Sequence, residues 1–307
     1  MSLDNRFSVV KSLFEEDYSK ASQQLDMARS KYDAAVAAGQ SQNVLDAHQR
    51  IIANREVYAS LTEWKASNCR DVSETDLQER SFVLDNYKNL VQQSVSDNLH
   101  VKFHGTSLRG AEGIIRSGGI LTASERDVAM RSQGGDGICI TDKNSIDTTV
   151  NGFCDLSTNG MNKYLPAGCI FVLLPKDESY DVMSNGSSEI VTGSYDFKED
   201  ESQLYAVFTT TENVSRINDL MRSSGLQPKV FSFADGLTML QRDSAAIDML
   251  IANHADVNLS NSNAVQSALQ SVHTDDKRST IKRSEAVLQD VIDGFDSQDK
   301  CSDSLTL

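Results

Sequence analysis

Apolar residues recur every three or four positions through the first third of the chain. From Phe7 to Ala35 they follow one face of a long helix, and a second stripe runs from Val44 to Trp64. Gly39 is placed to end the first helix, since glycine adopts the left-handed conformation that often follows a helix terminus. The short link between the two stripes predicts an antiparallel helical hairpin.

The second stripe is of the kind that packs in a core or faces a partner. It comprises Val44, Ala47, Ile51, Val57 or Tyr58, Leu61 and Trp64. A third helix is expected to begin near Ser73, because Ser73 and Asp76 have the spacing of a capping box with the shorter acid. The first 98 residues are therefore expected to form a helical domain.

The pattern changes near residue 98, where glycines become frequent and short apolar runs alternate with turn signals. This pattern predicts an α+β domain over residues 99–225 and a helical C-terminal segment over residues 226–307, with a polar, flexible tail. Strands are expected at residues 101–104, 137–141, 169–174, 188–192 and 204–209, with helices at 108–115, 214–221, 237–253 and 280–295.

Residues 247–258 resemble the second helix and exit turn of an ankyrin repeat, with His254 where that repeat has glycine. One repeat cannot bury its own apolar face, and no second copy is visible. The segment is therefore expected to be one degenerate repeat packed on the main domain.

The formal charge is −15, from 29 basic and 44 acidic residues. This balance argues against binding to nucleic acid or to anionic membranes, which requires clustered Lys and Arg. No apolar run approaches the roughly 20 residues that span a bilayer, and no cleavable signal peptide is visible. The five cysteines are scattered without metal-binding spacing, so we expect reduced thiols and no metal site.

The segment from Phe103 to Ser107 reads Phe-His-Gly-Thr-Ser and joins a predicted strand to a predicted helix. Gly105 has no Cβ, so its backbone can approach a ligand closely, and Thr106 and Ser107 can cap the helix. The segment resembles the first motif of the ADP-ribosyltransferase fold, in the group with a histidine on its first strand. The resemblance implies that His104 bonds the adenine-side ribose of NAD, that the backbone of Gly105 holds the nicotinamide amide, and that Thr106 belongs to the same site.

Residues 135–142 are similar to the second motif of that family, a strand with the pattern Gly-x-Tyr-x-Ser/Thr. The resemblance places Cys139 and Thr141 at the NAD site, although Cys139 stands where the family has the tyrosine that stacks on nicotinamide. Phe153 could supply the ring instead, since an aromatic face attracts the pyridinium cation. Plain packing in the core is the alternative for Phe153.

The third motif of the family is a glutamate that begins a late strand, after an apolar strand, a Pro-Lys turn and a loop. The apolar run 169–174, Pro175 and Lys176 lead to Glu189 in this way, without an insertion. The resemblance therefore implies that Glu189 is the catalytic carboxylate. A competing register uses Glu199 or Glu201, and an exposed glutamate at a strand end is the alternative without catalysis.

The reaction that the resemblance implies is the transfer of ADP-ribose from NAD, which is a substrate, to a protein. Breaking the bond between nicotinamide and ribose builds positive charge on the ribose, as in glycoside cleavage. A carboxylate on the 2′-hydroxyl stabilises that charge, and a neutral leaving group needs no metal. Glu189 and His104 are the expected catalytic residues of this glycosyltransferase.

The layout of helical front, transferase core and ankyrin-like tail resembles bacterial type III effectors of the CteC and OspC kind. Such virulence proteins and toxins are secreted without a cleavable signal peptide and act in the host cytoplasm. The resemblance implies a host acceptor, with a threonine of ubiquitin preferred and a caspase arginine, modified by ADP-riboxanation, as second choice. The helical front is a candidate surface for binding that partner, and its negative charge would suit a basic target. An NAD glycohydrolase and a non-catalytic helical interaction protein are the rival interpretations.

Overall fold

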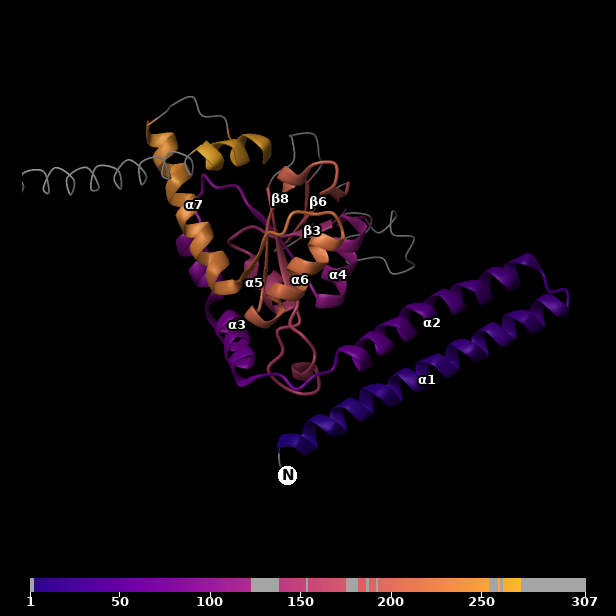
Figure 1. The fold of residues 1–307 in the computed structure, drawn as a ribbon. Helices are drawn as coiled ribbons and strands as arrows, with labels where there is room; N and C mark the ends of the chain where they lie inside the picture. Colours follow the sequence, from indigo (N-terminus) through magenta and orange to yellow (C-terminus); the bar gives the residue numbers. More distant parts are fainter. Residues whose placement is uncertain are drawn as a thin grey trace, which may run out of the picture.

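The computed structural model describes residues 3–122, 138–152, 154–174, 182–185, 188–191, 193–253, 259 and 262–271. In this part of the chain a helical hairpin projects from an α+β body (Figure 1). The hairpin consists of α1 (Leu3–Ala37) and α2 (Gln42–Asn68), and Gly39 has a φ of +64° in the turn between them. The expected hairpin and its glycine stop are confirmed.

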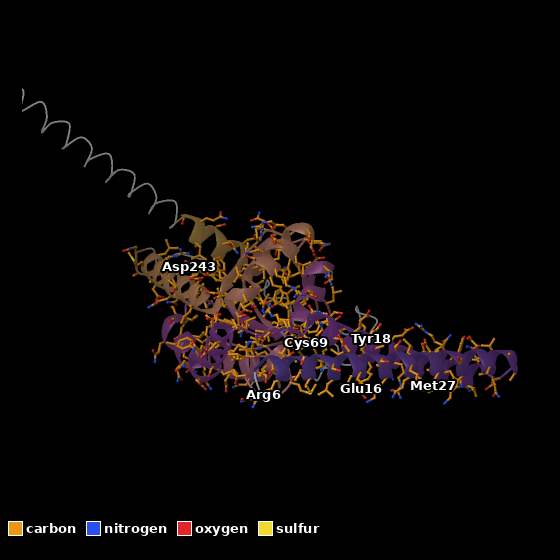
Figure 2. The ribbon with its side chains drawn as sticks, turned by 60° about the horizontal axis from the view of Figure 1, so that its bottom comes forward. Arg6, Glu16, Tyr18, Met27, Cys69 and Asp243 are labelled. Atoms are coloured by element: carbon orange, nitrogen blue, oxygen red, sulfur yellow. The ribbon has the colours of Figure 1, made fainter. Side chains whose placement is uncertain are left out.

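Small side chains form the seam between α1 and α2. The buried residues of α1 include Phe14, Ala21, Ala28 and Ala35, which recur every seven positions, as in helices that pack along their length. On α2 the buried residues are Ala59 and Thr62. Figure 2 shows that Arg6 lies beneath the body, whereas Met27 lies well out along the hairpin.

A four-stranded sheet lies at the centre of the body, in the order β1-β4-β8-β9. Its strands are β1 (Lys102–Thr106), β4 (Cys169–Leu173), β8 (Leu204–Thr209) and β9 (Val230–Ser232). The pairs β1–β4 and β4–β8 are antiparallel, and β8–β9 is parallel. β4 and β8 are buried at every position, because helices cover both faces of the sheet.

Three further strands form a second sheet on the other side of β1, in the order β3-β6-β5. They are β3 (Ile138–Ile140), β5 (Val182–Asn185) and β6 (Ser188–Val191). An antiparallel bridge between Phe103 and Thr141 joins β1 to β3. The strands that carry the three expected motifs therefore lie side by side. A separate short pair consists of β2 (Gly119–Ile120) and β7 (Tyr195–Asp196).

Two hydrophobic clusters fill the two faces of the sheet. One cluster contains Phe103 and Val172 and is covered by α3 (Glu74–Ser94), α5 (Ile146–Gly152), α7 (Phe233–Asn253) and a helix over residues 262–271. The other contains Phe171 and Ile140 and is covered by α4 (Leu108–Ser117) and α6 (Thr211–Ser223). Two short 3₁₀ helices, η1 (Asn162–Tyr164) and η2 (Glu201–Gln203), complete the described elements.

The α+β class and the five expected strands are confirmed. The sequence pattern does not reveal β2, β5, β7 and β9, which have at most four residues each. β9 pairs with β8, so the body continues past residue 225. The helix predicted at residues 280–295 and the exit turn at residues 254–258 lie outside the described residues.

α3 packs with the body, although its sequence pattern continues that of the hairpin. Val83, Tyr87 and Val91 are buried in the same cluster as Phe103. At its start the Ser73 side chain accepts a hydrogen bond from the N–H of Asp76 at 3.1 Å, as the capping pattern predicts. Within the described residues, no helix combines the length and apolarity required to cross a bilayer.

Candidate functional site

Four of the expected NAD-binding residues line one cavity, at the point where β1 and β3 separate. The cavity has a volume of about 970 Å³. His104, Gly105 and Thr106 reach it from β1, and Cys139 reaches it from β3. These positions come from two segments that the sequence separates by more than thirty residues.

β1 and β3 separate because, among the described residues, they share only the bridge between Phe103 and Thr141. Past this bridge the Cys139 carbonyl lies 2.8 Å from Nδ1 of His104. A carbonyl oxygen can only accept, so Nδ1 carries the proton and donates it to this bond. A neutral imidazole with its proton on Nδ1 has its acceptor lone pair on Nε2.

The backbone N–H and C=O of Gly105 point toward the place where β1 and β3 separate. Backbone groups of successive strand residues point to opposite sides, so those of Gly105 point toward β3, like those of Phe103. A Cβ at Gly105 would lie 2.6 Å from Cγ2 of Thr149 and 3.0 Å from Sγ of Cys154. Glycine is thus required by close packing against α5. It also leaves one N–H donor and one C=O acceptor directed to the cavity side, the pair that a primary amide requires.

α4 begins at the same cavity. The Ser107 side chain accepts a hydrogen bond from the N–H of Gly110 at 3.2 Å and caps the helix, as expected. Arg109 lines the cavity from the first turn and donates to Oγ of Ser60 at 3.0 Å. A helix N-terminus beside an arginine favours an anion such as a diphosphate.

Trp64 of α2 forms another part of the cavity wall, which sequence reasoning missed. Its Nε1 donates to Oε2 of Glu112 at 3.3 Å, and Glu112 is also paired with Arg216. The one available signal is that Trp64 is the only tryptophan of the chain and stands at the end of the second stripe. The helical hairpin therefore contributes an aromatic residue to the candidate site.

Among the described residues, Thr141 is expected at the site but does not line the cavity with the others. Thr141 is buried, and its hydroxyl lies 2.7 Å from the hydroxyl of Thr149, so it anchors the end of β3 to α5. Phe153 lies outside the described residues. Cys139 is half-buried, and burial raises the pKa of its thiol. The side chain of Cys139 is therefore a protonated thiol at neutral pH.

Glu189 lies on β6 directly opposite Ile140 of β3. Opposed residues of antiparallel strands share a face, and alternation then puts His104, Ile140 and Glu189 on one face of the sheet. Nζ of Lys102 contacts the two carboxylate oxygens of Glu189 at 2.7 and 2.8 Å, in a half-buried ion pair. The described lining of the cavity does not include Glu189.

Of the competing glutamates, Glu201 lies on the other side of β1. Glu201 begins η2, ahead of β8, and its Oε1 accepts a hydrogen bond from the N–H of Gln227 at 3.3 Å. Glu199 is exposed in the preceding turn. Since β4 separates β8 from β1, the sheet order puts Glu189 on the side of His104 and Cys139 and puts Glu201 on the opposite side.

The cysteines that the structure describes, Cys69, Cys139, Cys154 and Cys169, are free thiols, as expected. The described residues contain no group of three or more His, Cys, Asp or Glu side chains that could hold a metal ion. The chain matches no family model, and no curated protein and no solved structure is significantly similar to it.

Proposed function

We propose that the protein is an NAD–protein ADP-ribosyltransferase that binds NAD in the cavity between β1 and β3. The observation that carries the proposal is the separation of these strands at His104 and Cys139, which directs the N–H and C=O of Gly105 toward the cavity. Small-molecule sites have volumes of roughly 300–1,000 Å³, and a volume of about 970 Å³ suits a dinucleotide.

The groups that β1 and α4 present to the cavity would bind different parts of NAD. The backbone of Gly105 would bond the nicotinamide amide, and Nε2 of His104 would accept from a ribose hydroxyl. The N-terminus of α4 and Arg109 would hold the diphosphate. The geometry of these four groups is compatible with one extended ligand along β1 and α4.

Glu189 is the proposed catalytic carboxylate. When the bond between C1′ and nicotinamide breaks, the electron pair leaves with the neutral nicotinamide and positive charge develops on the ribose. A carboxylate bonded to the 2′-hydroxyl stabilises that charge. The acceptor then forms its bond to C1′ and releases a proton. Glu189 must exchange at least one contact with Lys102 for the ribose hydroxyl, and Lys102 holds the carboxylate until then.

The acceptor in this proposal is a host protein in the host cytoplasm, with a threonine of ubiquitin preferred over a caspase arginine. This choice rests on the resemblance to secreted effectors. A non-catalytic interaction protein is the second candidate, and it is favoured by one observation: Glu189 is bonded to Lys102 and is absent from the described cavity lining.

The test incubates the protein with tagged NAD and host-cell lysate, beside Glu189→Gln. The matched control is Glu199→Gln, an exposed glutamate in the turn between β7 and η2 that is not part of the described cavity lining. A labelled band that only Glu189→Gln loses supports the transferase. Nicotinamide release without a band identifies a glycohydrolase. Calorimetry that detects no NAD binding identifies the non-catalytic protein, and binding without transfer or release contradicts the role of Glu189.

A further inference from the structure

The apolar stripe of α2 faces away from α1. We define the α2 stripe as the apolar residues Val44, Ala47, Ile51, Tyr58 and Leu61 together with the polar residue Asn54, which lies among them. The exposed fractions of Val44, Ile51 and Tyr58 are 37%, 49% and 47%. The contact with α1 uses other positions of α2, which include Ile52, Ala59 and Thr62. A surface of the kind that usually packs against protein is thus left open to solvent on the described structure.

The spacing of the α2 stripe is that of a coiled-coil seam. Val44, Ile51 and Tyr58 are seven residues apart, and so are Ala47, Asn54 and Leu61. Alternating steps of three and four keep one side of a helix facing a second helix. Among the described elements only α1 packs extensively against α2, and Figure 1 shows the hairpin projecting from the body. The α2 stripe therefore has the geometry to seat one more helix.

The charges beside the α2 stripe are basic. Heptad spacing puts Arg50 on one edge and His48 and Arg55 on the other, and the heptad positions that flank the stripe hold no carboxylate. Arg55 also donates to the side chain of Gln24 on α1, and Asp46 lies one turn before Arg50. The carboxylates of Glu56 and Glu63 lie toward α1, where they contact Arg29 and Tyr18. Charges that flank a seam decide which partner a helix accepts.

We propose that the α2 stripe docks an amphipathic helix of another protein, one with apolar residues at heptad positions and carboxylates beside them. A second copy of this chain fits less well. It would bring Arg50 and Arg55 from both copies into one interface whose flanking heptad positions hold no carboxylate.

The α2 stripe leads toward the cavity. Tyr58 and Trp64 are six residues apart, which is about 9 Å along a helix axis. A helix seated on the stripe would thus lie next to the wall that Trp64 forms. The docking proposal does not depend on the reaction, because it rests on exposure, spacing and charge alone.

The test uses the full chain and two labelled helical peptides of about 21 residues, or three heptads. Both peptides have leucine at the seam positions, and one has glutamate and the other lysine at the flanking positions. Each peptide repels its own copies, so binding reports on the protein. We expect the glutamate peptide to bind at least about fivefold more tightly at low salt, with a smaller ratio at high salt. No binding of the glutamate peptide, or equal binding of both, would overturn the proposal.

Three variants localise the binding. Ile51→Glu should reduce the affinity of the glutamate peptide at least about tenfold, and Arg50→Glu should shift the preference toward the lysine peptide. Met249→Glu changes another exposed apolar residue, on α7, and should leave the affinity unchanged. Circular dichroism checks that helix content is retained. Sedimentation that shows a dimer abolished by Ile51→Glu would assign the stripe to a second copy and contradict the proposal.

Discussion

Gly105→Ala is expected to lower both the free energy of unfolding and the affinity for NAD. The new methyl group would lie 2.6 Å from Cγ2 of Thr149 and 2.9 Å from the carbonyl oxygen of the same residue. Contacts this short cannot persist, so β1 or α5 must move. Overpacking of a core costs about 1–3 kcal/mol, and we expect about 2–3 kcal/mol because one of the contacted atoms belongs to the backbone.

Urea denaturation followed by circular dichroism measures the loss of stability. Thr149→Ser removes Cγ2 but keeps the hydroxyl that lies 2.7 Å from Thr141, so it should recover part of the loss in Gly105→Ala. Gly152→Ala is the control, since a Cβ at Gly152 meets nothing within 4 Å. An unfolding free energy of Gly105→Ala within about 0.5 kcal/mol of the parent protein would refute the packing argument.

Calorimetry with NAD separates the two roles of Gly105. A displaced β1 moves the N–H and C=O groups that the proposed function assigns to the nicotinamide amide, so the dissociation constant should rise. If stability falls while NAD affinity stays the same, glycine is required only for packing, and the amide must bind elsewhere. The proposed NAD site would then lose its central contact.

Three further predictions concern buried groups. Burial raises the pKa of the Cys169 thiol to about 12, whereas the thiol of an unfolded chain has a pKa of about 8.5. Between these two pH values the folded protein keeps the thiol proton and the unfolded chain loses it. The free energy of unfolding should therefore fall as the pH rises through this range. The free energy of unfolding falls by about 1.4 kcal/mol per pH unit. The difference between the urea midpoints at pH 8 and pH 10 should therefore be smaller in Cys169→Ala than in the parent protein. Arg80→Met removes the buried ion pair with Asp76, in which the two side chains lie 2.5 Å apart, and should lower the free energy of unfolding by about 3–5 kcal/mol. Adding Asp76→Asn should recover part of this loss, and thermal melts measure both effects. Burial raises the pKa of Cys139, so iodoacetamide should modify it slowly at neutral pH, and NAD should slow the modification further; mass spectrometry that finds no effect of NAD would contradict its place in the site.

Local patterns predict the elements whose signal is contained in one segment. The long helices and the buried strands β4 and β8 have clear periodicity, and Ser73 and Ser107 cap helices through contacts three residues away. β9 has three residues, too few to show a period, and it forms because it pairs with β8. The stripe of α2 predicts a helix but not its orientation, because small residues such as Ala59 let α1 approach on another face.

Some residues of the candidate site can be predicted from the sequence, and others are placed only by the tertiary structure. His104 and Gly105 stand out in the sequence because they lie in one short segment that joins a predicted strand to a predicted helix. Thr141 shares a motif with Cys139, but spacing alone does not show that its hydroxyl lies buried against Thr149. Trp64 belongs to a different helix, so only the tertiary structure brings it to the cavity. Residues that depend on long-range packing are those that the sequence cannot place.

The contacts that attach the hairpin to the body connect the α2 stripe with the candidate NAD cavity. Trp64 donates to Glu112, Ser60 accepts from Arg109 at 3.0 Å, and Asn68 accepts from Arg216 at 2.8 Å. All three contacts lie in the last third of α2, and two of them reach α4, which borders the cavity. A helix docked on the α2 stripe would therefore lie against the helix whose last third, with α4, forms one wall of the cavity.

Binding free energies at two coupled sites change by the same amount in either order. If the docked helix shifts α2 against α4, saturating NAD should alter the dissociation constant of the glutamate peptide, and the peptide should alter that of NAD by an equal factor. Trp64→Phe removes the bond to Glu112 but keeps an aromatic ring, so it should weaken this coupling while both ligands still bind. Equal peptide affinity with and without NAD would show that the wall is rigid and that the two surfaces act independently.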